Sequence, residues 1–162
     1  MPVPLLITVA DIVQFGHKLR FARPCCTAII PVMAQKQGHI IIQSGVNVWP
    51  HELKTAQAFT AIGKDVEFIR RSEEQRVTSA DAVIDGLVWE MKAPTADNLK
   101  AVERNLKRGR WQSENIIFDC RRMKNVPDFA IERDVRKQAF AIPRIKRLRY
   151  VNKHGHVIDI KR

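Results

Sequence analysis

Cysteine is scarce in this sequence, and the patterns that bind zinc or mark secretion are missing. The three cysteines, Cys25, Cys26 and Cys120, form no Cys-x2-Cys pair and no Cys/His cluster, so neither a disulfide framework nor a zinc site is expected. The apolar run at residues 1–10 lacks a basic leader, and Asp11 cuts it short, unlike a signal peptide or a transmembrane helix. We therefore expect reduced thiols in a cytoplasmic setting.

Acidic side chains are scarce in the C-terminal part of the chain. Residues 100–162 hold eighteen basic and seven acidic side chains, whereas residues 1–99 hold ten of each, so the formal net charge of +11 arises after residue 99. This asymmetry favours a polyanionic partner, with nucleic acid first and an anionic membrane second. The alternative is that the basic charge only aids solubility.

The chain has enough apolar residues for a core. Its 162 residues fit one domain, and 45% of them are hydrophobic. We assign residues 1–45 to an N-terminal segment of unknown role and residues 46–162 to the main domain. The hydrophobic pattern predicts helices at 50–63, 93–107 and 127–140, a hairpin at 79–92, and strands at 66–70, 115–119, 145–151 and 157–160. This α-β-β-β-α-β-α-β-β order predicts an α/β (α+β) fold with a mixed central sheet flanked by helices.

The sharpest local signal is the hairpin. Asp85-Gly86 suits a type I′ turn, which needs positive φ at both central positions. Counting outward from this turn gives the pairs Ile84–Leu87, Val83–Val88, Ala82–Trp89, Asp81–Glu90 and Ser79–Lys92. One face is then apolar and carries Ala82, Ile84, Leu87, Trp89 and Met91. The opposite face carries Asp81, Glu90 and Lys92.

The expected Asp81–Glu90 pair indicates a metal site. Two carboxylates opposite one another on a sheet repel by roughly 0.2–1 kcal/mol on a wet surface, and more when sheltered. A divalent cation between them turns this repulsion into binding energy, because Mg²⁺ takes one or two carboxylates and keeps waters for a phosphate substrate. The alternative is a solvated hairpin face on which Glu90 pairs with Lys92.

Glu52 is a candidate third carboxylate. It lies on the same helical stripe as Ala56, Phe59 and Gly63, which places it on an inward face. A glutamate in the first turn of a helix also favours the helix dipole, so a structural interpretation is equally open.

Two clusters of basic residues are candidates for nucleic-acid contact. Lys100, Arg104, Lys107 and Arg108 gather on the side of a helix opposite its apolar stripe, where they can follow a phosphate backbone or form a solvated face. Arg144, Lys146, Arg147 and Arg149 form the second cluster, on what we predict to be an edge strand. Charge at such an edge can also serve to discourage edge-to-edge pairing.

This combination resembles the PD-(D/E)XK nuclease superfamily and, more closely, the tRNA-nuclease toxin domains at the C-termini of CdiA contact-dependent inhibition proteins. The resemblance covers about Trp49 to Ile160. It rests on Glu52-x3-Ala56, Gly63-Lys-Asp-Val66, Ser79-Ala-Asp81-Ala, Asp85-Gly-Leu-Val-Trp-Glu90-Met-Lys92 and Gln112-Ser113-Glu-Asn115-Ile-Ile. One departure is Ala80, where the superfamily name has Pro.

The resemblance implies a PD-(D/E)XK-like αβββαβ core and a metal-dependent nuclease. Asp81 and Glu90 would ligate Mg²⁺ or Mn²⁺, with Glu52 as an auxiliary ligand or a group that positions water. Lys92 would hold or deprotonate the attacking water and stabilise charge on the phosphoryl oxygens, and Gln112 would contact the site.

It also implies partners and a location. The substrate would be tRNA or another RNA first and DNA second, with no membrane partner. A cognate immunity protein would accompany a toxin, which would be delivered into a target-cell cytoplasm as part of a larger protein.

Two other functions stay open on the sequence. His51, His154 and His156 could support metal-free RNA cleavage by general acid–base catalysis. The chain could also be a basic module of a phage or mobile element that binds nucleic acid without cutting it.

Overall fold

The computed structural model describes residues 36–70 and 80–162, which belong to one unit, Ala34–Arg162. The expectations for Cys25, Cys26, Ser79 and most of the N-terminal segment lie outside the described residues. The first described strand, Ile40–Ile42, lies before the expected boundary near residue 45. The division into segment and domain stays a prediction.

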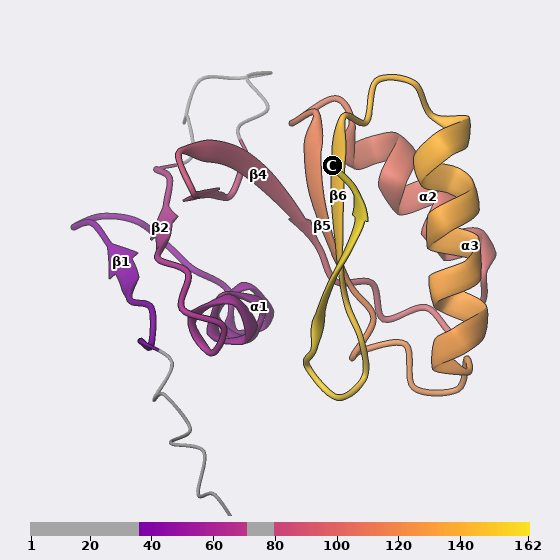
Figure 1. The fold of residues 1–162 in the computed structure, drawn as a ribbon, viewed down its shortest axis with the longest axis horizontal. Coiled ribbons are helices and arrows are strands. Elements are labelled where there is room, and N and C mark those ends of the chain that lie inside the picture. Colours follow the sequence, from indigo (N-terminus) through magenta and orange to yellow (C-terminus); the bar gives the residue numbers. More distant parts are fainter. Residues whose placement is uncertain (1–35, 71–79) are drawn as a thin grey trace, which may run out of the picture. The chain divides into compact units, whose positions relative to one another are not determined.

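A mixed sheet organises the described residues, and its seven strands follow one another in chain order (Figure 1). The strands are β1 Ile40–Ile42, β2 Val66–Phe68, β3 Ala82–Ile84, β4 Leu87–Lys92, β5 Asn115–Asp119, β6 Arg147–Val151 and β7 Val157–Lys161. The pairs β1–β2, β4–β5 and β5–β6 are parallel, and β2–β3, β3–β4 and β6–β7 are antiparallel. The expected mixed sheet and element order are confirmed.

Within residues 36–70 and 80–162, three helices cover this sheet: α1 Pro50–Thr60, α2 Lys100–Gly109 and α3 Asp128–Ala141. α1 contacts β1 and β2, whereas α2 and α3 pack against each other and against β4–β7, as Figure 1 shows. Two buried clusters result: one joins Ala56 and Phe59 of α1 to Trp89 and Met91, and the other joins α2 and α3 to β5 and β6. The centres of the two expected stripes, Ala56 with Phe59 and Val102 with Leu106, are buried. Gly63 lies beyond the end of α1 and is exposed, and Leu99 is half-buried.

The hairpin forms as predicted near its turn. Asp85 and Gly86 have φ values of 54° and 73°, and the ladder pairs Ile84 with Leu87 and Ala82 with Trp89. Asp85 also accepts hydrogen bonds from Lys64 at 3.1 Å and Arg149 at 3.3 Å. The paired residues of β3 and β4 end at Ala82 and Trp89. Asp81 therefore lies outside this ladder and contacts β4 through separate hydrogen bonds.

Two sequence expectations are corrected. α2 begins at Lys100 rather than near residue 93, because the Asn98 carboxamide accepts the backbone N–H of Ala101 at 3.1 Å and caps the helix there. β6, which carries Arg147 and Arg149, lies between β5 and β7 and is not an edge strand. β7 takes the edge, because the turn at Gly155 (φ 84°) returns the chain along the outer side of β6.

Candidate active site

Asp81, Glu90 and Lys92 are brought together at β4. Glu90 and Lys92 alternate with Met91 along the strand, so their side chains leave the same face. Asp81 stands directly before β3; its backbone N–H donates to the carbonyl of Trp89 at 3.0 Å, and its carboxylate accepts the backbone N–H of Met91 at 2.8 Å. Asp81 and Glu90 are 6% and 2% exposed, so this is a buried pair rather than a solvated face.

Only one of the two carboxylate oxygens of Glu90 has a hydrogen-bond partner among the described residues. Its Oε1 accepts a charge-assisted hydrogen bond from Lys92 Nζ, while its buried Oε2 has no hydrogen-bond partner among the described residues. Burial and then the nearby Asp81 carboxylate raise the Glu90 pKa to about 7, although Lys92 opposes the shift. A buried oxygen without a donor is costly, and this cost favours the neutral, protonated form of Glu90.

Lys92 is held from two sides. Besides Glu90, its ammonium donates to Gln112 Oε1 at 2.7 Å. Gly109, the last residue of α2, lies against both side chains: a Cβ there would stand 3.4 Å from Lys92 Cε and 3.6 Å from Glu90 Cγ. Sequence reasoning missed Gly109 because the predicted helix ended at residue 107, whereas α2 extends to Gly109.

Glu52 is buried at the start of α1. It is 5% exposed, and its Oε2 accepts the backbone N–H of Trp49 at 3.0 Å at the start of α1. Across residues 36–70 and 80–162, no group of three or more His, Cys, Asp or Glu side chains is arranged to hold a metal ion. The structure therefore joins Asp81 with Glu90 and does not add Glu52 as a third member.

The Asp81–Glu90 pair nevertheless fits a hard divalent cation. Mg²⁺ prefers oxygen ligands and is commonly held by one or two carboxylates with waters and substrate phosphates in its remaining positions. The pair offers carboxylate oxygens only, and the unpartnered Glu90 Oε2 is of the type that such an ion would satisfy. Asp81 and Glu90 are thus the residues that could hold a metal.

The basic side of α2 is open to solvent. Lys100, Arg104, Lys107 and Arg108 are all exposed, and with Glu103, Arg110 and Trp111 they line a cavity of about 490 Å³. Trp111 is 59% exposed, and the guanidinium groups of Arg110 and Arg144 each lie 4.9 Å from its ring. Sequence reasoning did not single out Trp111, although an aromatic residue following a basic run is typical of nucleic-acid surfaces.

The second basic cluster is only partly exposed: Arg144, Lys146 and Arg147 are exposed, and Arg149 is half-buried. Arg149 is largely covered: it pairs with Asp85 at 3.3 Å and Asp159 at 3.2 Å and lies 4.6 Å from the ring of Trp89. Lys146 pairs with Glu114 at 2.7 Å. Arg149 therefore stabilises the sheet rather than contacting a ligand.

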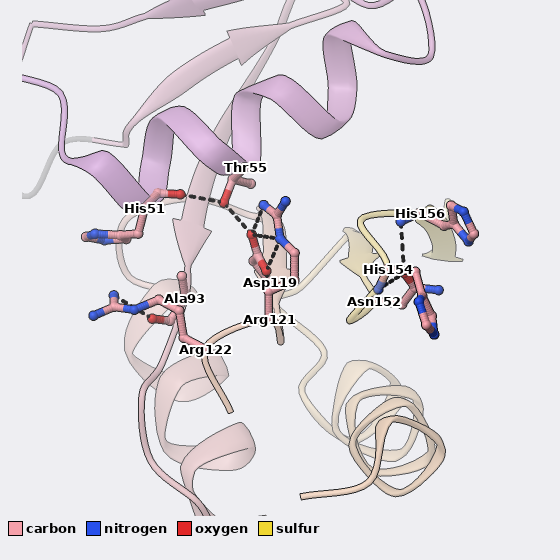
Figure 2. Close-up of polar contacts among 9 residues, drawn as sticks. All are labelled: His51, Thr55, Ala93, Asp119, Arg121, Arg122, Asn152, His154 and His156. Carbon is pink, nitrogen blue, oxygen red and sulfur yellow. Dashed lines mark hydrogen bonds and ion pairs between the residues drawn. The ribbon is translucent and has the colours of Figure 1, made fainter. Parts of the chain in front are cut away.

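The three histidines do not form one site. His51 is in the first turn of α1, whereas the backbone N–H groups of His154 and His156 donate to Asn152 Oδ1 at the β6–β7 turn, at 3.0 and 2.8 Å. Figure 2 shows the two groups at separate places. This geometry does not favour shared acid–base catalysis by these residues.

Comparisons with known proteins point to one family. Residues 78–157 match the model of the contact-dependent growth inhibition CdiA C-terminal domain. A CdiA-CT/CdiI toxin and immunity complex from Burkholderia pseudomallei contains a chain with 20% identity and a TM-score of 0.56, over 77% of this chain and 100% of that chain. No curated protein matches. Within the described ranges, no helix is long and apolar enough to cross a membrane. The described domain is therefore similar to the CdiA C-terminal toxin domain, in sequence over residues 78–157 and in fold over most of the chain.

Proposed function

We propose that this chain is a metal-dependent nuclease of the PD-(D/E)XK type that acts as a CdiA C-terminal toxin. The observation that carries the proposal is the buried Asp81–Glu90 pair, with one unpartnered Glu90 oxygen, beside a fixed Lys92. Asp81 and Glu90 would hold Mg²⁺ or Mn²⁺, and Glu52 stays a predicted auxiliary group. When bound, such an ion supplies a Lewis acid and lowers the pKa of a bound water.

Lys92 supplies the positive charge from the protein. Gln112 and Glu90 fix its ammonium at the end of β4, where it would hold the attacking water or stabilise negative charge on the phosphoryl oxygens. Such a preorganised donor is effective because it needs no rearrangement during the reaction. Gln112, expected to contact the site, thus has the specific task of positioning Lys92.

The nucleic acid would lie along α2. Lys100, Arg104, Lys107 and Arg108 would contact backbone phosphates. We propose RNA, with tRNA first, as the substrate, and DNA as the second candidate. The B. pseudomallei protein is in a complex with an immunity protein, so we also propose a cognate immunity protein here, acidic where it covers α2.

The test is a cleavage assay with purified protein. Total tRNA and plasmid DNA are incubated separately with Mg²⁺, Mn²⁺ or EDTA, and Glu90→Gln is compared with Glu114→Gln, which changes an exposed carboxylate. We expect one substrate to be cut, only with metal and only when Glu90 is present. Binding of both substrates without cutting would overturn the nuclease and leave a basic binding module.

A further inference from the structure

A second cationic site lies at the start of α1, apart from the basic side of α2. It is a cavity of about 250 Å³ lined by Pro50, His51, Lys54, Asp119, Arg121 and Arg122. Its volume exceeds several-fold the roughly 30 Å³ of one liquid water, so it admits a phosphate group with part of its hydration.

The charges of this cavity favour an anion. Lys54, Arg121 and Arg122 oppose one carboxylate, Asp119, which leaves a net charge of +2 with His51 neutral. Pro50 is the first residue of α1, so the positive end of the helix dipole also faces this region. Anions bind where backbone N–H groups at a helix start combine with cationic side chains.

The two arginines are held in place before any ligand binds. Arg121 donates to Asp119 from its backbone N–H and Nε at 3.0 Å and from Nη2 at 2.5 Å, and Thr55 fixes the other side of Asp119 with a 2.7 Å hydrogen bond. Arg122 donates from Nη1 to the carbonyl of Ala93 at 3.1 Å. Figure 2 shows the contacts of Asp119, at the end of β5, with Thr55 of α1 and with Arg121, and the separate contact of Arg122 with Ala93. Fixed donors lose little entropy on binding, which favours recognition of a phosphate.

The cavity lies at the carboxyl ends of β4 and β5, as Lys92 does, but on the opposite face of the sheet, because Asp119 alternates with Phe118 along β5. β4 and β5 are parallel, and Lys92 at the end of β4 is in register with Phe118, the neighbour of Asp119. The Arg122 contact is made to Ala93, the residue directly after Lys92. A nucleic-acid backbone that passes around the carboxyl ends of β4 and β5 can therefore contact both Lys92 and the cavity.

We propose that this cavity binds a backbone phosphate of the nucleic-acid substrate, away from the bond that is cut. The inference rests on the proposed function in that its ligand is the nuclease substrate, and it adds a contact that the α2 surface does not supply.

The test measures binding rather than cleavage. Fluorescently labelled tRNA, and separately a DNA duplex, are titrated with Glu90→Gln protein across a range of salt concentrations. The same protein is then given Lys54→Ala with Arg122→Ala, both at exposed side chains. The matched control is Arg133→Ala with Arg136→Ala, which removes two exposed cations from α3. Circular dichroism verifies that each variant is folded.

We expect the cavity variant to bind about tenfold more weakly and its slope of log affinity against log salt to fall by about one. The control should change neither quantity, and Arg122→Lys should retain part of the affinity. Unchanged affinity and slope in the cavity variant would overturn this inference while leaving metal-dependent cleavage intact. Conversely, absence of cleavage by the wild type, together with the expected binding loss, would overturn the nuclease and support the phosphate site.

Discussion

Glu90 of β4 and Asp119 of β5 are carboxylates on neighbouring strands that are equally buried but differ in the number of hydrogen bonds they accept. Glu90 is 2% exposed and Asp119 is 3% exposed. Asp119 accepts four hydrogen bonds from Arg121 and one from Thr55, whereas Glu90 has Lys92 on one oxygen and no donor on the other among the described residues. The first arrangement is that of a structural ion pair, and the second is the one for which we propose a metal ligand.

Asp128 extends the comparison to pKa values. Burial alone would raise its pKa, but hydrogen bonds from the Tyr150 hydroxyl and the Cys120 thiol outweigh this effect and lower it. For Glu90, burial and the Asp81 charge prevail and raise the pKa. The fold therefore stabilises the charge of Asp128 and disfavours the charge of Glu90.

The largest expected effect is on cleavage. Asp81→Ala and Lys92→Ala should each lower the rate by about 10³-fold, or roughly 4 kcal/mol of transition-state stabilisation, because each removes part of the reacting site. Initial rates on the preferred substrate measure this, with circular dichroism to verify the fold. Retained activity in both variants would contradict the assignment of the site.

The second effect is on stability at Asp119. Asp119→Ala should lower the free energy of unfolding by about 3 kcal/mol, because it leaves the partly buried Arg121 guanidinium without its partner. Urea unfolding followed by fluorescence measures the change. Wild-type stability in this variant would show that the satisfied carboxylate is not structural.

The third effect, at Glu90, is a gain in folding stability rather than a loss. Between the usual glutamate pKa of 4.5 and the folded value of about 7, the native state holds a proton that the unfolded chain has lost. Raising the pH through this window therefore destabilises the metal-free wild type. Glu90→Gln, which cannot ionise, should be more stable by about 2 kcal/mol at pH 8 and little changed at pH 5. Urea unfolding in EDTA at both pH values tests this, and equal stability of the two proteins at pH 8 would contradict it.

The smallest effect concerns binding along α2. Replacing Lys100, Arg104 and Lys107 by alanine should weaken nucleic-acid binding about tenfold, or about 1.4 kcal/mol, and flatten its salt dependence for every sequence. Fluorescence anisotropy in a Glu90→Gln background measures both quantities. An unchanged salt slope would remove α2 from the binding surface.

Short-range patterns explain what could be predicted from the sequence. The Asp85-Gly86 turn and the two-residue period of the strands determine the hairpin register, and the apolar stripe around Val102 and Leu106 determines the buried side of α2. Each depends on residues close along the chain. The start of α2 was missed because the Asn98 cap, rather than Pro94, sets the first turn.

Long-range contacts explain what could not be predicted. Whether β6 or β7 lies at the edge depends on strand order, which local patterns do not encode. The same holds for Gln112 reaching Lys92 and for Gly109 packing against Glu90, since each needs α2 placed on β4. The buried position of Glu52 was predictable, but its hydrogen bond to Trp49 was not.

Metal binding tests the central claim most directly. Isothermal titration of Mn²⁺ into wild type, Glu90→Gln and the control Glu114→Gln reports binding without depending on a substrate. We predict saturable Mn²⁺ binding by the wild type and by Glu114→Gln, and its loss in Glu90→Gln. Equal binding by all three proteins, or none by the wild type, would contradict the assignment of Asp81 and Glu90 as the metal-binding pair.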